Sequence, residues 1–144
     1  MTSAAAFREL AKHSLDLAIY AWPISVVLVT LALVALFYGN PLAQAQFRRG
    51  LRIILPTYAF PLAMIIVGTL LRYDWIAHPT WTEPPDWHGA VLSGVLILHA
   101  IAIITVTLVL KGLRMRSAAI ILPGFWLSLS SGFVAGIAIA GVGP

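Results

Sequence analysis

Apolar residues run in four long blocks along the chain, and each block is long enough to cross a lipid bilayer as a helix. The blocks are residues 17–38, 53–71, 89–110 and 118–141, and none of them contains Asp, Glu, Lys or Arg. An α-helix rises about 1.5 Å per residue, so roughly 20 apolar residues span the hydrocarbon core. The pattern predicts an all-α integral membrane protein, in which residues 17–144 form a four-helix transmembrane bundle.

The residues ahead of the first block, 1–16, have an amphipathic pattern. Phe7, Leu10, Ala11 and Leu15 recur at helical spacing, and charged residues lie between them. We expect this segment to be either a helix along the membrane interface or a disordered tail. A cleaved signal peptide is a further interpretation, because residues 43–45 resemble a cleavage site. The apolar run at 17–38 argues against it, since signal-peptide cores are about 7–15 residues long.

Basic residues are unevenly distributed among the connections between the blocks. The first and third connections hold six of them and no acidic residue: Arg48, Arg49, Arg52, Lys111, Arg114 and Arg116. The second connection, residues 72–88, has one Arg and three acidic residues. By the positive-inside rule, the first and third connections face the cytoplasm. Both termini and residues 72–88 are then extracytoplasmic, and we expect the cytoplasmic membrane of a bacterium or archaeon.

A short sequence motif occurs at both of the basic connections. Residues 49–56 read RGLRIILP, and the same motif returns as KGLR at 111–114 and IILP at 120–123. Seven of the eight positions match when residues 115–119 are skipped. The repeat favours two tandem helical hairpins, related by an axis along the membrane normal as in parallel-repeat transporters. Chance similarity between apolar segments is the alternative.

Composition excludes several classes of protein. Of the 144 residues, 60% are hydrophobic and 10% charged, with a mean hydropathy of +0.95, whereas soluble domains average about 25% charged residues. The absence of cysteine excludes disulfides, thiolate metal sites and iron–sulfur clusters. A net charge of +4 would suggest nucleic acid in a soluble protein. Here the basic residues adjoin apolar blocks, where they set topology or contact anionic lipids, so we expect no nucleic-acid partner.

The fourth block carries a small residue at every fourth position. These residues are Gly124, Ser128, Gly132, Gly136 and Ala140. Such a stripe lets a second helix approach closely, which is how helices associate in lipid. The stripe predicts a helix-packing interface, either with the second block of the same chain or with another subunit.

His99 is the polar residue expected near the middle of the membrane, where ionisable groups are usually functional. It is a candidate ligand of haem b, with either Met64 of the second block, a sulfur donor at comparable depth, or a histidine of another subunit as the second ligand. The favoured interpretation is a neutral histidine hydrogen-bonded to a hydroxyl group at position 30, 128, 130 or 131. No second histidine at equal depth on another block is available for a bis-histidine haem.

His88 is expected at the outer end of the third block, beside Trp87 and near residues 72–74. A quinone head group needs a hydrogen-bond donor, a proton acceptor and an aromatic wall, and this neighbourhood contains all three. His88 is therefore a candidate quinone contact. An ordinary interfacial cluster is the alternative, because tryptophan and tyrosine concentrate at membrane interfaces.

The outer connection, residues 73–88, concentrates three of the five tryptophans, Trp75, Trp81 and Trp87. We expect these rings to lie in the head-group layer or to contact an extracytoplasmic partner. His78, Glu83, Asp86 and His88 could be drawn as a metal site, but their spacing matches no recognised ligand pattern, and no metal is predicted.

The blocks contain no self-contained catalytic arrangement. They lack the embedded carboxylate of small proton-coupled exporters and the charged and amide groups of four-helix glutathione-transferase membrane enzymes, and the chain has no phosphate-binding glycine loop. We predict a small non-catalytic subunit of a larger membrane complex, respiratory or otherwise electron-transferring. It would pack through the fourth helix and present the Trp-rich connection. The alternatives are a redox subunit that binds haem b or quinone through His99, Met64 and His88, and a small-solute carrier.

Overall fold

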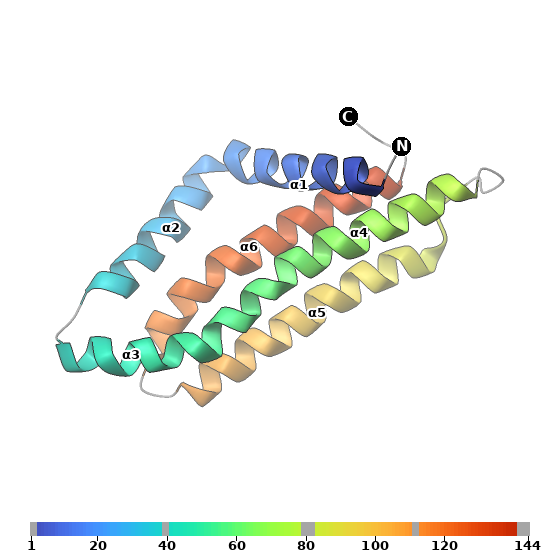
Figure 1. Ribbon diagram of the computed structural model, residues 1–144. Helices are drawn as coiled ribbons and strands as arrows, with labels where there is room; N and C mark the ends of the chain where they lie inside the picture. Colours follow the sequence, from blue (N-terminus) through green and yellow to red (C-terminus); the bar gives the residue numbers. More distant parts are fainter. Residues whose placement is uncertain (1–2, 39–40, 79–82, 111–112, 141–144) are drawn as a thin grey trace.

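The computed structural model describes residues 3–38, 41–78, 83–110 and 113–140, and these residues are almost entirely helical (Figure 1). The elements are α1 (Ser3–Tyr20), α2 (Trp22–Phe37), α3 (Pro41–Ile54), the 3-10 turn η1 (Leu55–Tyr58), α4 (Ala59–Ala77), α5 (Asp86–Val109) and α6 (Arg114–Ile139). The predicted all-α class is confirmed. Three segments, Gly50–Ala77, Asp86–Val109 and Met115–Ile139, are long and apolar enough to cross a membrane, and α1 with α2 makes a fourth if this bent pair is one span. The chain is an integral membrane helical protein.

Helix α6 lies at the centre of the fold and packs against α1, α2, α4 and α5. It runs parallel to α4, because Gly124 lies against Tyr58 and Gly132 against Met64. Helix α2 packs along α6 rather than along α4. The first two apolar segments therefore do not form the packed hairpin that the sequence repeat favoured.

The first predicted span, 17–38, is not one helix. Residues 17–20 continue α1, and the chain bends by 88° at Ala21 before α2 begins (Figure 1). Pro23 supplies the physical reason, since it has no backbone N–H and its ring would clash with the carbonyl of Ile19 in a continuous helix. At the start of a new helix proline is tolerated, because first-turn N–H groups have no intrahelical acceptor.

Two side chains close the elbow between α1 and α2. The Ser25 hydroxyl donates to the carbonyl of Ala18 at 2.6 Å and so reaches back across the bend. The indole N–H of Trp126 on α6 donates to Ser25 Oγ at 3.2 Å. The elbow is thus attached to the central helix by hydrogen bonds.

Helix α1 contacts the bundle through a row of mostly small residues, which differs from the predicted apolar row. The buried residues are Ala6, Leu10, Ser14 and Ala18, at four-residue spacing, whereas Leu15 is 56% exposed. Small side chains let α1 cross closely over α4 and α6. Because helices in lipid associate through close packing, the small residues of α1 face the bundle in preference to its larger apolar residues. Leu10 fills the crossing and comes close to Gly68.

The first basic connection forms a helix, α3, that the span analysis did not predict. Phe47 and Ile54 are buried, while Arg48 and Arg52 on the other side are exposed. This amphipathic spacing is readable in the sequence, but its basic residues make hydropathy assign the segment to a connection between two spans. The 3-10 turn then leads into α4, and the Tyr58 hydroxyl donates to the carbonyl of Ile120 on α6.

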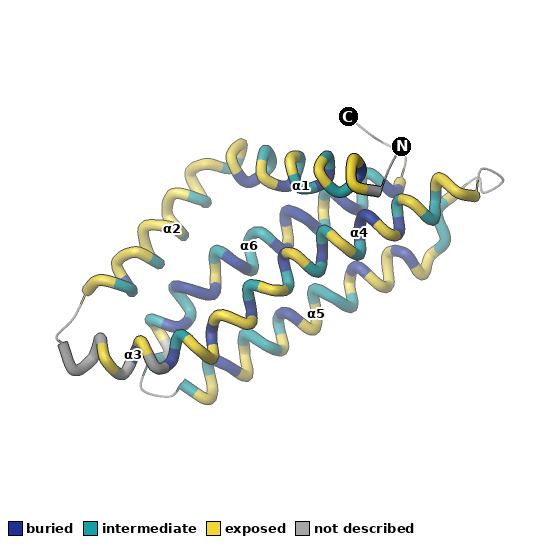
Figure 2. Tube along the Cα trace, in the orientation of Figure 1, coloured by how far each residue is buried: buried dark blue, intermediate teal, exposed yellow. Residues whose placement is uncertain are grey.

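Buried residues form two apolar clusters along the bundle (Figure 2). The cluster at the α1 end comprises Leu10, Met64, Leu71, Leu92, Ala135 and Ile139. The cluster at the α3 end comprises Ala35, Phe47, Ile54, Val106, Ile120 and Ile121. His99 lies two turns from both Leu92 and Val106 along α5 and is fully buried. A polar layer therefore separates the two apolar clusters.

Candidate functional site

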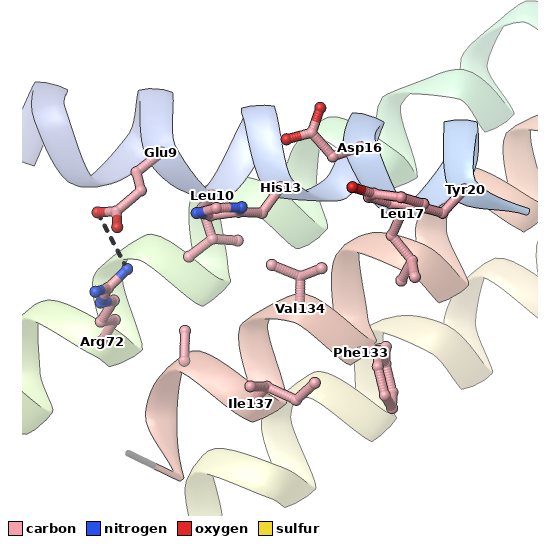
Figure 3. Close-up of a pocket in the computed structure, with 11 residues that line it drawn as sticks. Glu9, Leu10, His13, Asp16, Leu17, Tyr20, Arg72, Phe133, Val134 and Ile137 are labelled. Carbon is pink, nitrogen blue, oxygen red and sulfur yellow. Dashed lines mark hydrogen bonds and ion pairs between the residues drawn. The ribbon is translucent and has the colours of Figure 1, made fainter. Parts of the chain in front are cut away.

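A cavity of about 380 Å³ lies between α1 and α6 at the α1 end of the bundle (Figure 3). Its lining comes from three helices: Glu9, Leu10, His13, Asp16, Leu17 and Tyr20 of α1, Arg72 of α4, and Phe133, Val134, Ile137 and Ala138 of α6. The α1 side is largely polar and the α6 side is apolar. We call this the α1–α6 cavity.

Helical spacing places the polar side chains of the α1–α6 cavity in one row. Glu9, His13, Asp16 and Tyr20 follow one another at intervals of three or four residues, which is one face of a helix. Leu10 anchors α1 in the apolar cluster at that end, and this sets which face meets α6. Helical spacing separates the charged residues from the predicted apolar row, but it does not predict the cavity that they line.

One ion pair crosses the end of the α1–α6 cavity. Arg72 Nη1 lies 3.4 Å from Glu9 Oε2, as the dashed line in Figure 3 shows. His13 and Asp16 form no hydrogen bond or ion pair with any residue in the described part of the chain. The lining therefore contains two carboxylates, one guanidinium and the imidazole of His13, and Figure 3 shows the Asp16 carboxylate at the rim of the cavity, directed away from α6.

A second polar group surrounds Asp74 at the same end of the bundle. His88 Nε2 lies 3.2 Å from Asp74 Oδ2, and His78 Nδ1 lies 3.5 Å from Asp74 Oδ1. His88 is buried, and its ring meets Trp87 edge-on with centroids 4.1 Å apart. The sequence analysis placed His88 near residues 72–74, and the structure pairs it with Asp74.

His88 also lines a cavity of about 260 Å³ between α5 and the end of α6, which we call the His88 cavity. Gly136 and Ala140, the last two residues of the small-residue stripe, line it together with Pro85 and Leu92. Within the described residues, no three His, Asp or Glu side chains come together in a way that could hold a metal ion.

His99 lies in the polar layer and contacts three neighbours. Its Nδ1 lies 2.9 Å from Ser128 Oγ, one of the hydroxyl groups that the sequence analysis named. Phe60 stacks on the imidazole at 4.6 Å with an interplanar angle of 6°, and Phe125 meets it edge-on at 5.4 Å. These contacts are those of a packed, hydrogen-bonded histidine.

The surroundings of His99 do not fit a haem. Its Nε2 is buried and has no hydrogen-bond partner among the described residues, so this nitrogen would be the iron ligand. However, the side chain is fully buried, Phe60 covers its ring, and it lines none of the cavities described above. Met64 is also fully buried in the α1-end cluster, against Gly132. A porphyrin would require these helices to separate.

The small-residue stripe on α6 faces more than one neighbour. Gly124 lies against the ring of Tyr58, Ser128 bonds to His99, and Gly132 contacts Met64. A Cβ at Gly136 would meet nothing within 4 Å, which agrees with its place in the His88 cavity. The first three positions of the stripe therefore serve contacts within the chain.

A second group of small residues, which the sequence-based prediction missed, lies on α5. Gly89, Ala90 and Ser93 are exposed, Gly94 is half-buried, and a Cβ on either glycine would meet nothing within 4 Å. We call these four residues the α5 notch. The signal was present, because both Gly89/Ser93 and Ala90/Gly94 have the small-xxx-small spacing of membrane helix interfaces.

The tryptophans of the outer connection lie partly on helices. Helix α4 extends to Ala77 rather than ending at residue 71, so Trp75 belongs to its last turns and is half-buried. Trp87 lies in the first turn of α5 and is 49% exposed. Trp81 lies outside the described residues.

Comparison with known protein families, with curated proteins and with solved structures finds no match to this chain.

Proposed function

We propose that this chain is a small, non-catalytic subunit of a larger membrane complex and that a transmembrane helix of a neighbouring subunit docks on the α5 notch. The observation that carries the proposal is the empty space beside Gly89 and Gly94. Glycine destabilises a helix relative to alanine, so a glycine with empty space beside it brings the fold of this chain no benefit. Such a glycine does bring a benefit where the backbone of another helix comes close. No helix in the described part of the chain occupies that place.

Two other helical glycines, Gly68 and Gly124, show the contrast. A Cβ at Gly68 would lie 2.6 Å from Ala135 Cβ, and one at Gly124 would lie 3.2 Å from the Tyr58 ring. At these two positions the fold itself requires the small residue. At the α5 notch no such contact is present among the described residues: Gly89 lines the His88 cavity, and Gly94 is open to a neighbouring helix.

Trp87 gives the proposed interface a second feature. It lies one turn before Ala90, on the exposed side of α5, and tryptophan is enriched at the core of protein interfaces. With the orientation inferred from the basic residues, this end of the bundle is extracytoplasmic. The neighbouring subunit would then contact both the α5 notch and the outer connection.

An electron-transferring complex is the setting we favour, because the His88 cavity suits a quinone head group. A paired histidine and carboxylate can donate and accept hydrogen bonds, and Pro85 and Leu92 supply apolar walls. The test is quenching of tryptophan fluorescence in the purified protein by a short-chain quinone. His88→Gln should reduce the quenching and His13→Gln should not; equal quenching in both variants would contradict the quinone contact.

The subunit proposal is tested by site-specific photocrosslinking in the native membrane. A photoreactive residue at Ala90 should form an adduct with another membrane protein, and one at Leu33, which is 49% exposed on α2, should not. Gly94→Leu should abolish the adduct because it fills the notch, whereas Ile101→Leu on the same exposed side should leave it intact. An adduct of the mass of two copies of this chain, or equal adducts from both positions, would contradict the proposal.

A further inference from the structure

We infer that the α1–α6 cavity binds an amphiphile with an ammonium head group and an acyl chain. The inference is independent of the proposed complex, because every residue that lines the cavity belongs to this chain. A volume of about 380 Å³ lies within the range of about 300–1,000 Å³ typical of small-molecule sites.

The polar side of the cavity selects the head group. Glu9 and Arg72 pair with one another, whereas the Asp16 carboxylate, at the rim of the cavity in Figure 3, has no ion-pair partner among the described residues. A carboxylate accepts hydrogen bonds and attracts a cation, so a primary ammonium group satisfies it in both ways. An anionic head group would instead face two carboxylates and a guanidinium that is already paired, which disfavours phosphate-only lipids.

The apolar side accommodates the chain of the amphiphile. Val134 faces α1 from α6 in Figure 3, and Phe133 and Ile137 flank it. Phe133 is 59% exposed, on a helix that is apolar enough to cross a membrane, so the apolar side of the cavity is continuous with the lipid-facing surface. An acyl chain can enter sideways from the bilayer while its head group stays beside α1.

Two kinds of molecule share this chemistry, an ethanolamine phospholipid of the bilayer and a free long-chain amine. Native mass spectrometry of the full chain in detergent separates them, with phosphatidylethanolamine, dodecylamine and phosphatidylglycerol as the probes. We expect adducts with the two amines and weaker binding of phosphatidylglycerol. If phosphatidylethanolamine binds more tightly than dodecylamine, the site is a lipid site, and the reverse order identifies an amine site; either order supports the inference.

Asp16→Asn is the decisive variant. It removes the charge and should lower the affinity for both amines about fivefold, as expected for a partly exposed ion pair. Asp86→Asn removes an acidic residue at the same end of the bundle but in the His88 cavity, and it should leave amine binding unchanged. Loss of phosphatidylglycerol binding to the same extent, or equal effects of the two variants, would overturn the inference.

A second pair of variants tests the cavity by volume rather than charge. Ile137→Trp fills the apolar side and should abolish the amine adducts, whereas Ile104→Trp, at an exposed position of α5, should not. Circular dichroism checks that both variants remain helical. Retention of amine binding in Ile137→Trp would place the amphiphile elsewhere and overturn the inference.

Discussion

Gly68 lies where α4 and α6 approach one another closely. A Cβ there would lie 2.6 Å from Ala135 Cβ and 3.5 Å from Leu10 Cδ2, so Gly68→Ala must push two helices apart. We expect it to destabilise the protein by about 1–3 kcal/mol, the usual cost of overpacking. Denaturant unfolding in detergent, followed by circular dichroism, measures the loss.

Gly94→Ala is the matched control, because its Cβ would meet nothing within 4 Å. It should change the free energy of unfolding little. The double variant Gly68→Ala with Ala135→Gly should recover most of the lost stability, since it restores the space. Equal destabilisation by the two glycine substitutions would show that the loss of stability does not come from the close packing of Gly68 against Ala135.

His99 gives the second prediction at this scale. His99→Gln keeps a hydrogen-bonding group near Ser128, so it should cost about 1 kcal/mol or less, as for such pairs in membrane helices. Ser128→Ala should cost a similar amount, and the double variant should cost less than the sum. The purified wild-type chain should show no Soret absorption; a Soret band that His99→Gln abolishes would reverse the assignment in favour of haem.

Residue types were more predictable than their surroundings. A histidine in an apolar span must find a partner, so a hydroxyl neighbour for His99 could be named from the sequence, and Ser128 is that neighbour. The Phe60 ring that covers the imidazole could not be named, because the sequence of an apolar helix does not show which aromatic side chain packs against which neighbour. The roles of His88 and Met64 in binding a cofactor stay predictions.

At the scale of the elements, the elbow between α1 and α2 depends on Ser25. Ser25→Ala removes the hydrogen bonds to Ala18 and from Trp126, which should widen the range of angles between the two helices. The chain contains no cysteine, so spin labels can be attached at cysteines placed at Lys12 and Leu31, both exposed. Pulsed electron paramagnetic resonance should show a broader distance distribution in the variant.

Ser93→Ala serves as the control for the elbow, because Ser93 is an exposed serine on α5. Its distance distribution should match that of the wild type. An unchanged distribution in Ser25→Ala would show that Pro23 and the packing of α2 on α6 hold the bend without the hydroxyl group.

Element boundaries were predicted well where the helix is straight and poorly where it bends or leaves the apolar block. The predicted spans at 89–110 and 118–141 correspond closely to α5 and α6, since long charge-free runs leave little choice in lipid. Helix α4 runs on to Ala77 through Arg72 and Asp74, because both side chains find partners outside the apolar core. Hydropathy alone ends the helix at the first charge.

For the whole molecule, the distribution of basic residues predicts the topology. Arg48 and Arg52 are exposed on α3, at the opposite end of the bundle from α1. We expect a cysteine at Lys12 to react with a membrane-impermeant maleimide in intact cells, and a cysteine at Arg52 to react only after the membrane is opened. Labelling of position 52 but not of position 12 in intact cells would show that the protein has the opposite orientation.

The sequence by itself determined the class of this protein and the number of its long apolar segments. In hydrocarbon every backbone polar group must be satisfied within the protein, so charge-free runs of this length form helices. It also determined which residues share a face of a helix, such as the small-residue stripe of α6, because helical periodicity is local.

Only the tertiary structure decided which face meets which. It placed α6 at the centre, left the α5 notch uncovered, paired Asp74 with His88, and formed the open α1–α6 cavity between α1 and α6. The physical reason is that lipid tails are as apolar as the helices, so helix association depends on close packing and a few hydrogen bonds rather than on hydrophobicity. Those contacts join residues far apart in the chain, and the hydropathy pattern does not predict them.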